Sequence, residues 1–292
     1  MVEFLEFTLQ GLSAGLIYAA IALSLVLIWR GTRVLNYSQG AMAMLTAYVA
    51  LEIVYLTGNY WLAFVVALIA GLALGAVVER LVVRQVTGKP PLNAVIVTIG
   101  LLIGIEGLAG ILFGADNRSF PEPFSAIGLS IGTVALGITR NDIFTAISVL
   151  VAAGLFAVLF RYTSIGLKLR ATAFNPPVAR LLGVRVGRML TLGWALAGLL
   201  GALAGMLVTP STLLSPNSMD TIFVLGFTAA VIGGLESPVG AVIGGLVLGV
   251  VLSYAGGYLG SATVNLFGLA ALLLVLMLRP TGLFAAAPAR RV

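Results

Sequence analysis

The sequence predicts an all-α membrane protein, a polytopic bundle of about eight to ten transmembrane helices. Of its 292 residues, 60% are hydrophobic and only 9% are charged, whereas a soluble domain carries roughly a quarter charged residues. The apolar run 8–29 is long enough to cross a hydrocarbon core of ~30 Å at ~1.5 Å per residue. Such runs are continuous rather than alternating, which excludes a transmembrane β-barrel.

The distribution of positive charge orients the predicted bundle. All but two of the 16 basic residues fall in alternate loops or tails: Arg30, Arg33, Arg80, Arg84, Lys89, Arg161, Lys168, Arg170, Arg180, Arg185, Arg188, Arg279, Arg290 and Arg291. Only Arg118 and Arg140 lie in the other loops. This positive-inside pattern predicts an external N-terminus and a cytoplasmic C-terminus. It also argues that the net charge of +6 serves membrane orientation, not nucleic-acid binding.

The chain is expected to form a single transmembrane domain, 1–292. The start MVEFLEF has two glutamates and no basic residue, so we expect no cleavable signal peptide. Nine spans satisfy the predicted orientation: 8–29, 36–56, 61–80, 92–113, 143–160, 189–208, 221–235, 238–254 and 262–279. The span 221–235 is short and ends in Gly233-Gly234, which predicts a broken or re-entrant helix.

Two segments between spans are expected to lie outside the bilayer. Residues 114–142 contain Pro121 and Pro123 with balanced charge, and we expect them to form an external loop. Residues 166–184 are basic and too short to span, and we expect them on the cytoplasmic side.

The segment 166–184 is predicted to form two short helices. Gly166–Ala173 can make about two turns, Asn175 suits an N-cap, Pro176 suits the first helical position and Gly183 suits the stop. Two interpretations fit this basic, partly apolar segment. It is either a membrane-surface helix held by anionic lipids or a docking helix for a cytoplasmic partner.

Two polar stretches precede a Gly-Ala pair at the start of a predicted span. They are Asn36–Ala41 and Glu236–Ala241, and each is predicted to begin a helix, with Ser237 as the cap and Pro238 at the first position of the second. Transporters often build binding sites from breaks at corresponding places in two repeats. The similarity covers six residues, so a true repeat and a chance similarity both stay open.

Four motifs resemble the LivH-type permeases of branched-chain amino acid ABC importers. They are Leu35–Gly40; Leu169–Ala171 with Asn175-Pro176 and Leu182-Gly183; Gly233-Gly234 through Gly240-Ala241 with Gly244-Gly245; and Leu278–Leu283. The resemblance implies a permease domain in a bacterial inner membrane, together with a homologous LivM-type permease, two cytoplasmic ATPases and an external solute-binding protein. It also implies that 166–184 couples to an ATPase through Arg170, Asn175, Pro176, Arg180, Leu182 and Gly183. Glu106 and Glu236 depart from the neutral or amide residues expected there.

The sequence also limits the chemistry of this chain. It contains no GxxxxGK[ST] phosphate-binding motif, so ATP and Mg²⁺ are expected on partner ATPases and no cofactor on this chain. Cysteine and histidine are both absent, which removes thiolate nucleophiles, histidine bases and the usual zinc ligands. We therefore expect a transport subunit and not an enzyme. The alternative is an ion-coupled secondary transporter or channel that works without an ATPase.

The candidate residues of a translocation path are Asn36, Ser38, Gln39, Glu106, Gly233, Gly234, Glu236 and Ser237. A carboxylate such as Glu106 inside a span is costly unless it faces protein or water. Glu106 could accept a substrate ammonium or could simply be a hydrogen-bonded packing residue. The break around Glu236 could hold substrate at a helix N-terminus, or it could be only a gate or a cytoplasmic turn.

Glycines at close spacing predict tight helix packing. Gly71 and Gly75 form a GxxxG motif, and Gly193, Gly198, Gly201 and Gly205 recur at three- to five-residue spacing within one span. Small residues at this spacing let helices approach closely. The same faces could form the seam with a second permease.

Overall fold

The computed structural model describes residues 2–124, 128–131, 134–279 and 281–284. Within this part, seven helices are long and apolar enough to cross a membrane: α1 (Val2–Thr32), α2 (Gln39–Thr57), α3 (Tyr60–Leu81), α4 (Pro91–Phe113), α5 (Arg140–Tyr162), α8 (Val186–Val208) and α10 (Pro238–Leu259). Two shorter apolar helices, α9 (Asp220–Gly233) and α11 (Thr263–Leu278), match the remaining predicted spans. The predicted helical membrane bundle is confirmed.

The loop predicted at 114–142 contains a short hairpin. Strand β1 (Gly128–Ile131) pairs antiparallel with β2 (Val134–Thr139), and Ser130 lies opposite Ala135. Thr139 then caps α5, since its side chain accepts a hydrogen bond from the Asp142 N–H and the Asp142 carboxylate bonds back to the Thr139 N–H. This capping box starts α5 at Arg140, three residues before the predicted span. Asp142 also accepts a 2.5 Å bond from Ser13, which fixes this corner to α1.

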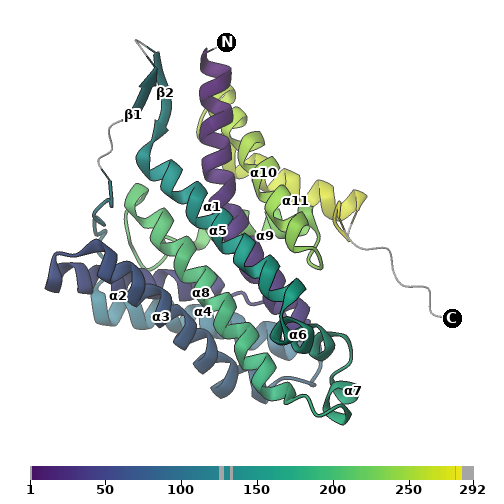
Figure 1. Cartoon of the computed structure of the whole chain (residues 1–292). Coiled ribbons are helices and arrows are strands. Elements are labelled where there is room, and N and C mark those ends of the chain that lie inside the picture. Colours follow the sequence, from purple (N-terminus) through teal and green to yellow (C-terminus); the bar gives the residue numbers. More distant parts are fainter. Residues whose placement is uncertain (1, 125–127, 132–133, 280, 285–292) are drawn as a thin grey trace.

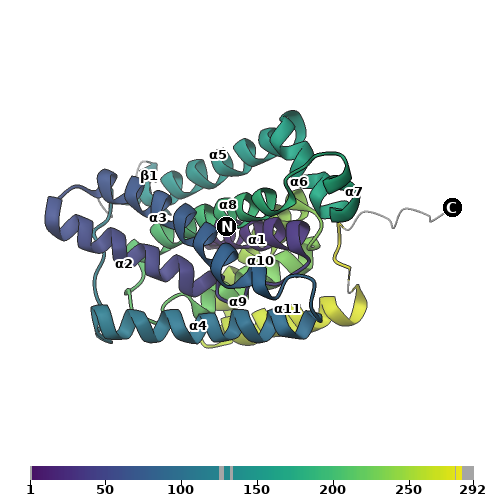
Figure 2. The same ribbon diagram turned by 90° about the horizontal axis from the view of Figure 1, so that it is seen from below.

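The helices differ strongly in burial. Most of α1 and α8 is buried, whereas only a small part of α4 and α5 is buried. Figure 2 shows α5 along one margin and α4 along the opposite one, with α1 and α8 between them. The exposed side chains of the outer helices are apolar, as Ile111 on α4 (84% exposed) and Leu155 on α5 (65% exposed) illustrate. Such faces suit lipid or another membrane subunit rather than water.

Glycines allow the closest helix contacts. A methyl group added to Gly75 on α3 would collide with the Trp194 carbonyl of α8, and one on Gly15 of α1 would lie 2.7 Å from the Gly245 carbonyl of α10. Gly198 and Gly205 on α8 are similarly covered by backbone. The predicted small-residue packing is therefore confirmed at Gly75, Gly198 and Gly205, whereas Gly193 has no such close contact. Gly15 adds a contact of the same kind, which the sequence did not predict, between α1 and α10.

The connecting segments sort to two ends of the bundle. The hairpin and the N-terminus lie at one end, and the short helices α6 (Ser164–Phe174) and α7 (Pro176–Leu181) lie at the opposite end (Figure 1). At the α6–α7 end, Arg33 after α1 pairs with Glu236. At the hairpin end, Arg118 pairs with Glu52 at 3.0 Å. Loops predicted for opposite sides of the membrane thus occupy opposite ends of the molecule.

Candidate functional site

The linker between α1 and α2 enters the interior of the bundle. Asn36, Ser38 and Gln39 have no exposed surface. The Leu35 carbonyl accepts a 3.3 Å hydrogen bond from Thr98 of α4. Gln39 donates a 2.9 Å bond to the Ala197 carbonyl, which lies in the middle of α8. Helix α2 therefore begins among its neighbours and not at the end of the bundle.

The three polar side chains satisfy one another at this break. The Asn36 Oδ1 atom accepts bonds from the Ser38 N–H at 3.1 Å and from the Ser38 hydroxyl at 2.6 Å. The Asn36 amide donates to Gln39 Oε1 at 2.9 Å. Asn36 thus makes the side-chain turn that starts α2, whereas the Ser38 side chain makes no cap bond. In this conformation the cluster positions the helix start and presents no exposed surface to a solute.

The N-terminus of α9 lies against this break. A methyl group added to Gly40 would come 2.9 Å from Phe223 Cβ and 3.3 Å from the Met219 carbonyl. The Tyr37 ring lies 6.4 Å from Phe223 and 6.5 Å from Phe227, measured between centroids. Two helix starts therefore meet inside the bundle, which sequence reasoning did not anticipate because the two helices are distant in the chain.

The first residue of α9 lies near Glu106. The Asp220 carboxyl is close enough to the Glu106 carboxyl of α4 for the two groups to interact. Asp220 was not among the predicted site residues, although an acidic first residue before the apolar span was visible in the sequence. Two facing carboxyl groups are acceptors suited to an ammonium group.

The predicted break at 233–237 is present at the other end of α9. Gly234 adopts φ +94°, a value that favours glycine. Ser237 caps α10 by accepting a 2.9 Å bond from the Gly240 N–H, and Pro238 takes the first position, as predicted. Gly233 packs directly on the Gly240 backbone. The turn is therefore tightly packed, and Gly234 is a turn residue.

Glu236 lies apart from the buried polar cluster. Its side chain is 49% exposed and pairs with Arg33 at the α6–α7 end. The structure therefore does not unite the predicted path residues. Asn36, Ser38 and Gln39 are buried, Glu106 faces Asp220, and Gly233–Ser237 form a turn at the end of the bundle.

A cavity of about 330 Å³ connects this turn with α6. Its polar lining comes from Arg30, Arg33, Arg170 and Glu236, and Gly193 of α8 lies on the same wall. Arg30 also lies over the Phe160 ring, 5.8 Å from its centroid. The cavity thus brings the predicted coupling segment next to the predicted break.

The segment 166–184 folds as the sequence predicted. Asn175 caps α7 by accepting a 3.2 Å bond from the Val178 N–H, Pro176 begins that helix, and Gly183 follows it with φ +80°. Three large apolar side chains point away from the protein: Phe174 is 89% exposed, Leu181 87% and Leu182 76%. Arg170 and Arg180 are exposed on the same segment. The surface combines apolar and cationic side chains.

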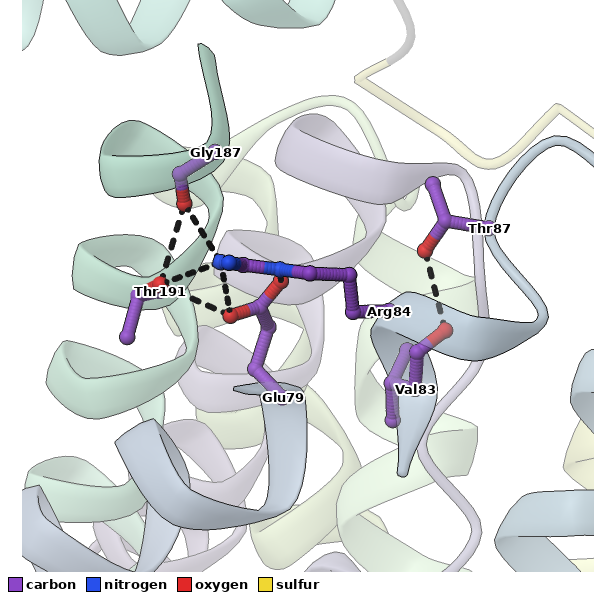
Figure 3. Close-up of polar contacts among 6 residues, drawn as sticks. All are labelled: Glu79, Val83, Arg84, Thr87, Gly187 and Thr191. Atoms are coloured by element: carbon purple, nitrogen blue, oxygen red, sulfur yellow. Dashed lines mark hydrogen bonds and ion pairs between the residues drawn. The ribbon is translucent and has the colours of Figure 1, made fainter. Parts of the chain in front are cut away.

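A buried ion pair fixes the end of α3 to the start of α8. The Glu79 side chain is 1% exposed, and Arg84 donates to both of its oxygens, at 3.1 and 2.8 Å. Arg84 also donates to the Gly187 carbonyl, and Thr191 donates to Glu79 at 2.7 Å (Figure 3). Sequence reasoning missed this network because Thr191 and Glu79 are 112 residues apart in the chain and only folding brings them together.

The helical membrane fold of this chain is also found in a solved ABC transporter. An inward-facing ABC transporter of the metal-chelate type is similar in fold, with a TM-score of 0.52 at 17% identity over 93% of this chain and 86% of the other. Residues 7–278 match the family described as branched-chain amino acid transport system, permease component, and the chain belongs to this family. The predicted LivH-type resemblance and a multi-pass inner-membrane location are thereby confirmed.

Two relatives match over nearly the whole chain. The high-affinity branched-chain amino acid permease protein LivH of Salmonella typhimurium is 29% identical, over 96% of this chain and 95% of the relative. The permease protein BraD of Pseudomonas aeruginosa, from the same type of transport system, is 27% identical over the same shares. Both are named as permease proteins of a transport system.

Proposed function

We propose that this chain is a permease subunit of an ATP-driven importer that moves a branched-chain amino acid, or a similar small polar solute, into the cytoplasm. The solute passes along a seam with a second, LivM-type permease. Two cytoplasmic ATPases hold ATP and Mg²⁺, and an external binding protein delivers the solute. Family membership supports the class of transporter, and the names of the relatives support the class of solute.

The exposed surface of α6 and α7 is the observation that carries this proposal. Phe174, Leu181 and Leu182 expose apolar area beside Arg170 and Arg180 at one end of the bundle. Exposed apolar patches rimmed by charge mark interaction sites. Because Asn175, Pro176 and Gly183 build the turn that presents this surface, an ATPase seated there can move α6 and, through the 330 Å³ cavity wall, the Arg33–Glu236 turn.

The solute path is proposed to pass the junction of α2 and α9. Glu106 and Asp220 supply acceptors for an ammonium group. Asn36, Ser38 and Gln39 hold the start of α2 by their mutual bonds. The Gly233–Ser237 turn ends the short helix α9 and gives it a place to pivot. Broken helices of this kind are tolerated inside a membrane protein where protein or a cavity surrounds them.

Exchanging Arg170 and Arg180 for glutamate together tests the coupling surface. We expect normal membrane insertion, because both side chains are exposed, and loss of ATPase co-purification, because the surface charge is reversed. Arg161→Glu is the matched control, since Arg161 is exposed near α6 but outside 166–184. Full recovery of the ATPases with normal uptake in the double variant would contradict the docking role.

Reconstitution of the isolated chain in liposomes distinguishes the importer from the alternative function, a secondary transporter or channel. The chain alone in liposomes is expected to show no uptake of labelled leucine, because motion is driven from the partner ATPases. Uptake by the isolated chain, driven by an ion gradient or by diffusion, would contradict the importer proposal.

A further inference from the structure

A cleft rich in arginine lies between the end of α3 and the junction of α7 with α8. Its volume is about 650 Å³, and five arginine side chains line it: Arg80, Arg84, Arg180, Arg185 and Arg188. Gly187 and Thr191 complete the wall that the Glu79–Arg84 network holds in place (Figure 3). The cleft is thus built by an interaction that joins two distant parts of the chain.

The positive charge of the cleft is largely uncompensated. Glu79 neutralises Arg84, but among the described residues no ion pair involves Arg80, Arg180, Arg185 or Arg188. The sequence has no acidic residue between Asp142 and Asp220, and Glu79 is the only one between Glu52 and Glu106. Four cations therefore gather around one cavity with no acid of their own. Arginine side chains favour phosphate, which they bind through paired N–H groups.

The position of the cleft indicates which kind of phosphate-bearing molecule would bind there. Val77 (50% exposed) and Leu81 (61% exposed) flank Arg80 on the last turns of α3, a helix apolar enough to span the membrane. These two apolar side chains do not line the cleft, but through Arg80 they place an exposed apolar surface of α3 beside its cationic lining. A phospholipid offers a phosphate and acyl chains together, whereas an acidic protein surface offers only the charge. Basic pockets between helix ends are known places for anionic headgroups.

We propose that this cleft binds the phosphate headgroup of an anionic phospholipid from the cytoplasmic leaflet. Arg80 and Arg188 contact the phosphate, and Arg84 shapes the wall through Glu79 and Gly187. The lipid would rest against the end of α3 and the start of α8, the helix that follows the coupling segment. This site is separate from the solute path, but it shares Arg180 with the coupling surface of α6 and α7, so the variants that test it leave Arg180 unchanged.

Native mass spectrometry of the full-length chain tests the site by titration with phosphatidylglycerol and, in parallel, phosphatidylcholine. We expect the chain to retain phosphatidylglycerol in preference to phosphatidylcholine. Replacing Arg80 and Arg188 with glutamine should weaken phosphatidylglycerol binding roughly tenfold or more, whereas Arg161→Gln should leave it unchanged. Arg185→Gln serves as a milder second variant, and thermal unfolding checks that each variant is folded.

Three results would overturn the proposal. Equal binding of phosphatidylglycerol to the double variant and the native chain would show a general surface effect. Displacement of the lipid by millimolar inorganic phosphate would show a site for a soluble anion. Unchanged lipid binding with loss of the ATPases from the double variant would assign the cleft to the ATPase instead.

Discussion

Glu79 shows how one buried residue depends on its partners. Its carboxylate is almost completely inaccessible and accepts bonds from Arg84 and Thr191. Arg84 is 40% exposed, so it keeps contact with water even without Glu79. The two halves of this ion pair are therefore not equivalent, because only Glu79 would be left as a charge cut off from water.

We expect Arg84→Gln to lower the free energy of unfolding by roughly 3 kcal/mol, and Glu79→Gln to lower it by less. The double variant should be more stable than Arg84→Gln alone, since it removes the stranded carboxylate as well. Thermal unfolding in detergent measures all three, with the exposed neighbour Arg80→Gln as control. Equal losses for both single variants would contradict the asymmetry.

Helices α3 and α8 pack closely because glycines lie at their contact. Gly75 leaves no room for a methyl group against the Trp194 carbonyl. On α4, by contrast, a methyl group added to Gly104 meets nothing within 4 Å. A glycine-to-alanine substitution therefore meets a packed backbone at Gly75 and open space at Gly104.

Gly75→Ala is expected to lower the stability of the isolated chain by about 1–3 kcal/mol, because the helices must separate. Gly104→Ala should be neutral or slightly stabilising, since alanine favours the helix by up to about 1 kcal/mol. Thermal unfolding of both variants checks this difference. If Gly104→Ala is harmless in the isolated chain but prevents assembly with the second permease, α4 lies at the seam.

At the scale of the whole molecule, the predicted orientation places the two ends of the bundle on opposite sides of the membrane. The chain has no cysteine, so single cysteines can be introduced without background. Asn117 is exposed at the hairpin end, and Lys168 is exposed on α6 at the other. Ser125, an equally suitable position in the predicted external loop, lies outside the described residues.

We expect Asn117→Cys to react with an impermeant thiol reagent added outside intact cells. Lys168→Cys should react only after the membrane is opened, because the basic ends are retained in the cytoplasm. Mass-shift labelling on gels reports both. Labelling of Lys168→Cys in intact cells, with protection of Asn117→Cys, would reverse the predicted orientation.

Most of the local structure could be predicted from the sequence because its causes are local. Long apolar runs specify membrane helices, and the caps at Asn175 and Ser237 formed as expected because a cap needs only its own first turn. The short span 221–235 was correctly singled out, and it became the 14-residue helix α9. The alternation of basic loops likewise predicted which segments gather at each end.

The tertiary structure decided which residues meet. Asn36 and Glu236 each begin a polar stretch before a Gly-Ala pair in the sequence. In the structure Asn36 is a buried turn residue, whereas Glu236 is an exposed partner of Arg33. Helices distant in the chain must pack together before Glu106 comes near Asp220. The same packing brings Thr191 to the Glu79–Arg84 pair. Hydropathy specifies that a helix enters the membrane, but side-chain packing specifies its neighbours. The sequence by itself therefore determined the class of protein, its helices and its charge asymmetry, while folding alone determined the sites.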